Sequence, residues 1–368
     1  MDELPLAILS DILSRVSGES LLRYRCVCKR WREVIDDSYF RNSVHRPQEP
    51  VLLCEERKHG KIYLLMEHEE VPTKTVQIAK FPMLKDYALQ GHCHGLLFYV
   101  PMEDVEDNPE LLINPLTKEI LTLSRAPDLS PHKSVYGLGF DYSTNTYKMV
   151  QISVIDYDKK TRTMGARVYD FEKRSWRTCK APPLSHGAFP AFPDYGFVFA
   201  SGALNWYLDG YSSSEGMFKR AVLSFDLTHE EFSSMSLPDV PPRNDLQMRE
   251  LEGSLALLLH LKKAHIEVWV LKDDTRREWI RKYTIRPPCP HGFYMVVGSY
   301  KRDKLILHLW RDPRYKHEGL GEGEFVTYDV NENRIAGSDT KPDTAPTYQW
   351  RHSCCTSLSL VSLKPHRN

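Results

Sequence analysis

One short pattern recurs along most of this chain and restricts the fold more than any other feature. Each copy is an extended apolar run that ends in Asp or Asn, followed by a turn and, six positions on, a large apolar residue. The Asp or Asn residues are Asn114, Asp170, Asp226, Asp273 and Asp329, at spacings of 56, 56, 47 and 56. The sixth positions are Ile120, Trp176, Phe232, Trp279 and Ile335. Because Asp and Asn side chains hold turns by accepting backbone hydrogen bonds, each copy predicts a β-hairpin whose sixth residue returns to the sheet.

A second hairpin precedes most copies, most clearly at 137–152, 196–208 and 296–310. Two hairpins make four antiparallel strands per unit, and repeats of about 50 residues are typical of kelch-type β-propeller blades. We therefore predict a mainly β fold, a kelch-like propeller of six four-stranded blades. The blades are expected near 51–86, 87–125, 135–181, 195–238, 249–286 and 293–337. Lys272 stands before Asp273 where other copies have an apolar residue, so that boundary stays open.

The first blade has only about three predicted strands, between Val51 and Met83. The stretch 353–363 alternates like a strand and has no partner in the sixth blade. Pairing it with the first blade would close the ring and cover an exposed edge. We predict this closure.

The first 45 residues have a different period. Pro5 occupies a first helical position, and apolar residues then recur at spacings of three and four through Val16. Ser17-Gly18 ends this helix, and the pattern resumes from Leu21 to Ile35. Three short helices of this kind rarely bury their apolar side chains alone, so a partner is expected. The alternative is a helical hairpin that packs on its own propeller.

This segment resembles the F-box, through which substrate receptors attach to the Skp adaptor of SCF-type ubiquitin ligases. The resemblance rests on Leu4-Pro5, Ile12-Leu13, Leu21-Leu22 and the run from Cys26 to Trp31. It implies that these apolar residues divide between a small internal core and the groove of the adaptor, a helix-in-groove mode of binding. The adaptor-binding residues it implies are Leu4, Pro5, Ile8, Leu9, Ile12, Leu13, Leu21, Leu22, Cys26, Val27, Lys29 and Trp31.

The remainder resembles the F-box-associated domain of the large plant F-box family. The matching stretches are Gly95-Leu96-Leu97, Asn114-Pro115 with Thr117, 136–141, 147–150, 202–206 and 223–226. The resemblance implies an adaptor-binding F-box at 1–45 and a substrate-binding propeller at 46–368. It also implies a non-catalytic receptor that recruits a target protein for ubiquitination, with a Skp-type adaptor, a cullin scaffold and an unidentified protein substrate as partners. A cullin-independent F-box binding protein and a propeller enzyme with a helical appendage are the alternatives.

Composition limits other functions. Lys+Arg and Asp+Glu are equal at 49, which gives no bulk attraction to nucleic acid or anionic membrane. The basic run Arg23, Arg25, Lys29, Arg30 and Arg32 could suit DNA, but a solvated or partner-facing helix explains it at least as well. We expect no nucleic-acid or membrane partner. The eight cysteines contain no C-x-x-C pair, and no signal peptide is visible, so a cytoplasmic or nuclear location is expected.

Catalytic and metal signatures are weak. The sequence has no G-x-S-x-G, H-E-x-x-H or P-loop pattern. His92 and His94 would share a strand face without a nearby third ligand, so we expect neither metal nor cofactor. The repeated Asp residues could be imagined as an acid–base ring, although turn capping is favoured. His186, His291, His308 and His317 are expected in or beside loops as solvated residues.

The predicted substrate site lies on the face that carries the long connections, because long loops often carry function. These connections are 101–110, 156–165, 209–219 and 311–323 within blades, and 126–134, 182–194, 239–248, 287–292 and 338–347 between blades. Their candidate substrate-binding residues are Phe189, Phe192, Tyr211, Phe218, Phe293 and Tyr315. Alternatively, these aromatics pack onto the blades. With these strands the linker from residues 1–45 enters on the same face, so either the helical domain covers part of that face or the first strand is misassigned.

Overall fold

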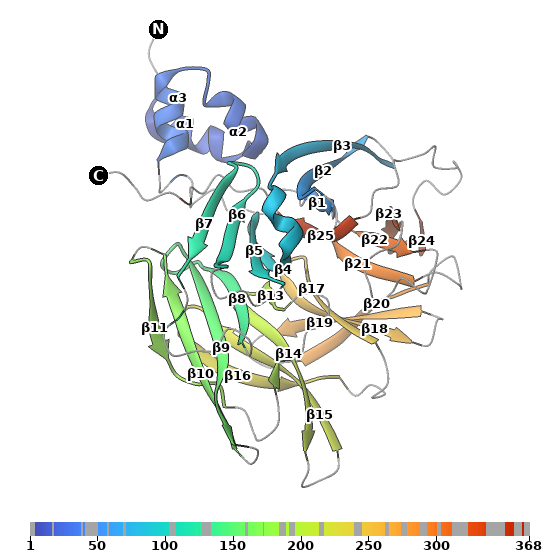
Figure 1. The fold of residues 1–368 in the computed structure, drawn as a ribbon. Helices are drawn as coiled ribbons and strands as arrows, with labels where there is room; N and C mark the ends of the chain where they lie inside the picture. Colours follow the sequence, from blue (N-terminus) through green and yellow to red (C-terminus); the bar gives the residue numbers. More distant parts are fainter. Residues whose placement is uncertain are drawn as a thin grey trace.

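The structure is a computed structural model that combines a small helical unit with a six-bladed β-propeller (Figure 1). It describes residues 4–16, 18–37, 40, 51–56, 59–68, 71–102, 108–124, 126, 134–158, 161–171, 173–183, 189–190, 196–212, 217–238, 245–261, 265–273, 278–286, 293–299, 303–310, 323–335, 350–356 and 363. The helices are α1 (Leu6–Ser14), α2 (Gly18–Tyr24) and α3 (Lys29–Asp36).

Each blade is an antiparallel sheet whose strands are ordered outward from the centre of the ring. The first blade contains β25 (Trp350–Thr356), β1 (Val51–Glu56), β2 (Lys61–His68) and β3 (Val71–Lys80). The second contains β4 (Tyr87–Cys93), β5 (Leu96–Pro101), β6 (Glu110–Asn114) and β7 (Glu119–Leu123). A short 3-10 helix, η1 (Pro82–Asp86), joins these two blades.

The next two blades follow the same plan. The third contains β8 (Ser134–Asp141), β9 (Thr146–Asp158), β10 (Thr161–Asp170) and β11 (Ser175–Cys179). The fourth contains β13 (Val198–Ala200), β14 (Ala203–Ser212), β15 (Met217–Asp226) and β16 (Glu231–Ser236), with the two-residue β12 (Phe189–Pro190) paired to the far end of β14.

The last two blades complete the ring. The fifth contains β17 (Asp245–Leu251), β18 (Ser254–Leu261), β19 (His265–Asp273) and β20 (Glu278–Ile285). The sixth contains β21 (Phe293–Ser299), β22 (Lys304–Trp310), β23 (Gly323–Asp329) and β24 (Arg334–Ile335). The predicted count of six four-stranded blades is confirmed. The doubtful boundary at Lys272 coincides with a register shift between Leu271 and Asp273 in the β19–β20 pair.

The predicted closure by the C-terminal strand is also confirmed, with different bounds. β25 pairs with β1, where Cys354 lies opposite Leu53 and Thr356 opposite Val51. The described strand spans Trp350–Thr356, and residues 357–362 of the predicted stretch lie outside the described residues. β25 is the innermost strand of its blade, so β1 takes the second place that β5 has in the next blade.

This placement determines where the helical linker enters. We call the face with the first-to-second and third-to-fourth strand turns the turn face, and the opposite face the loop face. The amide of Gly95, in the β4–β5 turn, donates to Thr356 Oγ1 at 3.0 Å, which places Val51 and Thr356 on the turn face. Of the two expected possibilities, misassignment of the first strand is therefore correct, because β1 is a second strand and runs in the opposite direction to a first strand.

The core lies between blades, where small residues let neighbouring sheets approach. Trp206 of β14 is fully buried, and its indole Nε1 donates to the Tyr136 carbonyl of β8 at 2.8 Å. A Cβ on Gly137 would lie 2.6 Å from the Trp206 ring, so this position requires glycine. The Gly137-to-Phe140 stretch therefore has a packing role between the third and fourth blades.

The sixth-position tryptophans join neighbouring blades at their outer strands. Trp176 Nε1 donates to the Ser124 carbonyl at 2.6 Å, and Trp279 Nε1 donates to the Ser236 carbonyl at 3.0 Å. Each indole thus contacts the end of the preceding blade. Both indoles are half-buried, because they lie on outer strands with one blade face toward solvent.

Candidate functional site

The helical unit separates its apolar side chains into an inner and an outer set. On α1, Leu9 and Leu13 are 4% and 0% exposed, whereas Ile8 and Ile12 are 49% and 47% exposed. The helical period of 3.6 residues places neighbouring residues about 100° apart, so adjacent apolar residues point in different directions. α1 therefore presents apolar surface to solvent while it also fills a core.

The inner set forms a small core that includes one residue of the propeller. Its buried members are Leu9, Leu13, Leu21, Val34, Ile35, Phe40 and Leu116. Leu116 comes from the β6–β7 turn, so the helices complete their core with the propeller. The helices therefore bury part of their apolar surface against the propeller, while further apolar side chains stay exposed.

The outer set comes from the start of the chain, from α1 and from the α2–α3 connection. Its exposed apolar members are Leu4, Leu6, Ile8, Ile12, Tyr24 and Val27. Val27 is 62% exposed, a large fraction for a valine next to a packed helix. Arg30 of α3 donates to the Leu4 carbonyl, which brings the beginning of α1 beside the beginning of α3. We call the outer set the helical apolar surface.

Polar contacts hold these helices in place. Cys28 is the N-cap of α3, where its Sγ accepts from the Trp31 amide at 3.5 Å. Arg25 pairs with both carboxylate oxygens of Asp36, at 2.5 and 2.8 Å, and this hydrogen bonding raises the pKa of Arg25. Arg25, Arg30 and Arg32 of the basic run all make contacts within the unit. These contacts give the run a structural role.

The predicted adaptor-binding residues divide in three. Those exposed to solvent are Leu4, Pro5, Ile8, Ile12, Cys26, Val27 and Lys29. Leu22 and Trp31 are half-buried. Leu9, Leu13 and Leu21 are buried in the helical core, on the core side of the expected division between a small internal core and the adaptor groove. Leu6 and Tyr24 are further exposed apolar residues of this unit that the sequence prediction did not include, and for Leu6 its apolar type next to Pro5 was the available signal.

The predicted substrate-binding aromatics are placed differently from expectation. Phe189 lies in β12, Tyr211 and Phe218 pair across the β14–β15 hairpin, and Phe293 begins β21. These four are strand residues, so assigning them to loops was wrong, and the predicted loops 156–165 and 209–219 are largely extended hairpins. The strands of these two hairpins, β9–β10 and β14–β15, are ten or more residues long and extend through the ranges predicted as loops. Phe192 and Tyr315 lie outside the described residues.

The loop face carries exposed apolar residues that the sequence reasoning missed. Met83 of η1 and Met102 after β5 are 41% and 58% exposed. The Met102 amide donates to the Asp86 carbonyl at 2.9 Å, so η1 and the end of β5 are neighbours. Flexible thioether side chains suit adaptable protein contacts. The helical unit contacts the β6–β7 turn on the opposite, turn face.

The repeated carboxylates act as turn caps wherever the structure describes their side chains. Asp226 Oδ1 accepts from the amides of Thr228 and His229, both at 2.8 Å, and Asp329 Oδ1 accepts from two amides at 3.0 Å. Asp170 accepts from the Lys173 amide at 3.0 Å. In each of these residues Oδ1 holds the turn that follows it, which is the turn-capping role that the sequence favoured.

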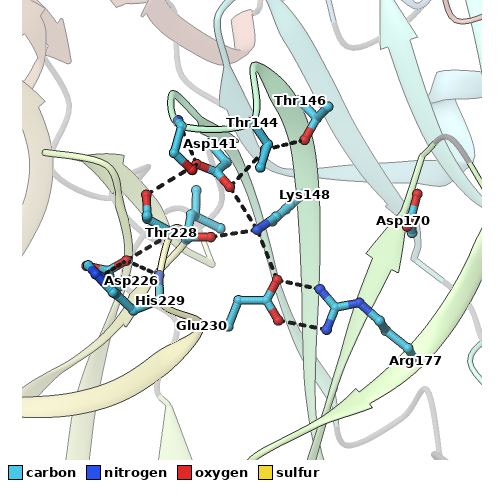
Figure 2. Close-up of polar contacts among 12 residues, drawn as sticks. Asp141, Thr144, Thr146, Lys148, Asp170, Arg177, Asp226, Thr228, His229 and Glu230 are labelled. Atoms are coloured by element: carbon cyan, nitrogen blue, oxygen red, sulfur yellow. Dashed lines mark hydrogen bonds and ion pairs between the residues drawn. The ribbon is translucent and has the colours of Figure 1, made fainter.

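Figure 2 shows a denser polar cluster between the third and fourth blades. Lys148 Nζ lies 2.8 Å from Asp141 and 2.9 Å from Glu230, and donates to the Leu227 carbonyl at 2.7 Å. Arg177 pairs with both oxygens of Glu230. Burial would raise the pKa of Asp141, but hydrogen bonds from Lys148 and Ser143 outweigh it and hold the pKa far below its usual value. The Lys148 ammonium is fully engaged, which indicates an inter-blade ion pair.

Replacing Lys148 by methionine is expected to lower the free energy of unfolding by about 3–5 kcal/mol, because it leaves the buried Asp141 carboxylate unpaired. The depressed pKa values of Asp141 and Glu230 stabilise the fold above about pH 4, and that contribution is lost as the pH falls toward the folded-state values. The difference in free energy of unfolding between the Lys148→Met variant and the wild type should therefore be smaller in acid. Urea titrations at pH 7 and pH 3.5 measure it.

Lys173→Met is the matched control, since Lys173 lies 3.7 Å from Asp170 and is 77% exposed. A surface pair contributes about 0–1 kcal/mol, so this variant should unfold nearly like the wild type. If both lysine variants lost the same free energy of unfolding, the assigned role of the inter-blade cluster would be contradicted.

Three of the histidine candidates, His92, His94 and His308, lie within the described residues. Among the described residues, no group of three or more His, Cys, Asp or Glu side chains is arranged to hold a metal ion. Burial lowers the pKa of His92 and of His94 to about 4. His308, expected beside a loop, is instead buried in β22 against Phe325, because its strand faces the neighbouring blade. His186, His291 and His317 lie outside the described residues.

Comparison with known families agrees with this division into helices and propeller. The profile of the F-box associated beta propeller domain matches residues 50–335, and that of an F-box-like domain matches residues 1–46. The chain belongs to the F-box-associated β-propeller family. It is an F-box protein with an associated propeller, as the sequence resemblance implied. No helix in the described part of the chain is long and apolar enough to span a membrane.

Individual relatives agree with this membership. The F-box/kelch-repeat protein At3g23880 of Arabidopsis thaliana is 28% identical over 73% of this chain and 76% of its own length. The F-box protein At2g40925 of the same plant is 27% identical over 96% of this chain and 89% of its own. An oligogalacturonate lyase from Vibrio parahaemolyticus has a TM-score of 0.41 at 10% identity, covering 83% of each chain. A structural similarity with so low a TM-score supports no conclusion about catalysis.

Proposed function

We propose that this F-box protein is a non-catalytic substrate receptor of an SCF-type ubiquitin ligase. The helical apolar surface docks a Skp-type adaptor, and the adaptor connects the chain to a cullin scaffold. The propeller binds the protein to be ubiquitinated, in the cytoplasm or the nucleus. The observation that carries the proposal is the exposure of Ile8, Ile12 and Val27 on a unit that already has a complete core.

The arrangement of the two faces supports the role of the propeller. The helical unit packs beside the β6–β7 turn on the turn face, so the loop face is left on the other side for a substrate. We therefore keep the loop face as the proposed substrate site, with Met83 and Met102 added to the candidates there. In this role the receptor contributes proximity and orientation, and other subunits perform ubiquitin transfer.

Co-purification tests this proposal. The tagged full chain is expected to capture both the adaptor and the cullin, and a protein stabilised by proteasome inhibition should join them. Capture of the adaptor without the cullin would instead support a cullin-independent F-box binding protein. Capture of neither would overturn the proposal.

A further inference from the structure

The β6–β7 turn of the second blade holds the helical unit, and we call residues 114–119 the seat. Leu116 is 8% exposed and belongs to the helical core with Leu13 and Ile35. A side chain of the propeller is thus part of the interior of the F-box unit. Such a contact fixes position as well as adding stability, because packed interiors tolerate little displacement.

Comparison with the equivalent turns shows that the seat is specialised. All five repeated turns have the same length, from Asn114 to Glu119 and from the corresponding Asp to the first residue of the next strand elsewhere. The second residue after the Asp or Asn is polar in the other four, where it is Glu172, Thr228, Thr275 or Asn331. Leu116 is the apolar exception. Its position is the one that the helices cover.

The turn itself is held firmly. The fully buried Asn114 accepts from the amides of Leu116 and Thr117, at 3.0 and 3.3 Å, through its Oδ1. These bonds orient the Leu116 backbone toward the helices in the same way that Asp226 orients its own turn. The Leu116 side chain therefore enters the helical core from a turn whose backbone is already fixed by Asn114.

Glu119 adds a polar contact at the same point. Its Oε2 accepts from the Leu363 amide at 2.7 Å, and the Leu363 carbonyl accepts from Arg174 at 3.1 Å. The pKa of Arg25 is raised first by the hydrogen bond that Arg25 donates to Asp36, and the charge of Glu119 acts in the same direction. The seat, which belongs to the second blade, thus contacts both the helical unit and Leu363.

We infer that the seat locks the F-box unit in one orientation on the propeller, and that Leu116 is the positioning residue. What this orientation serves rests on the proposed function: an adaptor bound to the helical apolar surface would be presented at a fixed angle to a protein held on the loop face. The locking itself is independent of any partner.

Distance measurement by pulsed electron paramagnetic resonance on the full chain tests the lock. Nitroxides are attached through non-canonical residues at Asp11 of α1 and Lys173 of the β10–β11 turn, which are 52% and 77% exposed. The wild type should give one narrow distance distribution. Leu116→Thr introduces the residue found at the equivalent turn of the fourth blade, and should broaden the distribution while circular dichroism keeps its helical signal.

Asn331→Thr makes the same residue at the equivalent turn of the sixth blade and should leave the distribution narrow. Leu116→Ala, a milder variant, should give intermediate broadening and serves if Leu116→Thr loses its helices. A broad wild-type distribution, or a Leu116→Ala distribution as narrow as the wild type, would overturn the inference. These readings need no adaptor, so a failure of adaptor capture would count against the proposed function alone.

Discussion

A chain that ends at residue 349 is expected to be insoluble or fully sensitive to protease, whereas a chain that ends at Thr356 should fold. The first truncation removes β25, the innermost strand of the first blade, which pairs with β1 and contacts β4 and β21. Cys354 then leaves a core that contains Leu53, Leu89, Leu97 and Tyr99. Each large apolar side chain returned to water costs about 1.5–3 kcal/mol, so a few such losses equal a typical total stability of about 5–15 kcal/mol.

The second truncation is the matched control. It keeps β25 and removes one described residue, Leu363, whose burial contributes about 1.5–3 kcal/mol. Thermal unfolding of the two truncated chains and the full chain provides the measurement. If the chain that ends at residue 349 melted like the full chain, ring closure by β25 would not support the fold.

The double variant Ile8→Asp and Ile12→Asp is expected to abolish adaptor binding without unfolding the protein. Both side chains are about half exposed, so the substitutions disturb little in the isolated chain. On docking, two lost isoleucine contacts cost about 3–6 kcal/mol, which weakens binding by more than about a hundredfold, and burying two carboxylates adds to this. Titration calorimetry with the purified adaptor measures the effect.

The control repeats the same chemical change elsewhere. Ile120 of β7 and Ile280 of β20 are 36% and 37% exposed on outer propeller strands. Aspartate at both positions should leave adaptor affinity unchanged. Substitution of Leu21, which is fully buried, would not serve because it would disrupt the helical core itself. Wild-type affinity in the Ile8 and Ile12 variant would remove the helical apolar surface from consideration as the docking site.

Much of the architecture could be read from the sequence because it depends on local patterns. The Asp or Asn turn and its sixth residue lie within one hairpin, so five copies predicted the blades and their boundaries. The unpartnered alternating stretch near the C-terminus predicted closure of the ring, since an open sheet edge requires a partner. The helical period at the start of the chain likewise indicated a separate unit.

Other features depended on contacts between distant residues, which local patterns do not encode. Ile8 and Leu9 are adjacent apolar residues, and only the packing of three helices decided that Leu9 lies inside and Ile8 outside. The direction of β1, and with it the face where the linker enters, followed from the inner position of a strand some 300 residues away. The partnership of Leu116 with the helices, and that of Lys148 with Glu230, join residues from separate hairpins. Periodicity shows that a side chain must be buried, whereas its partner is decided by the packing of the whole ring.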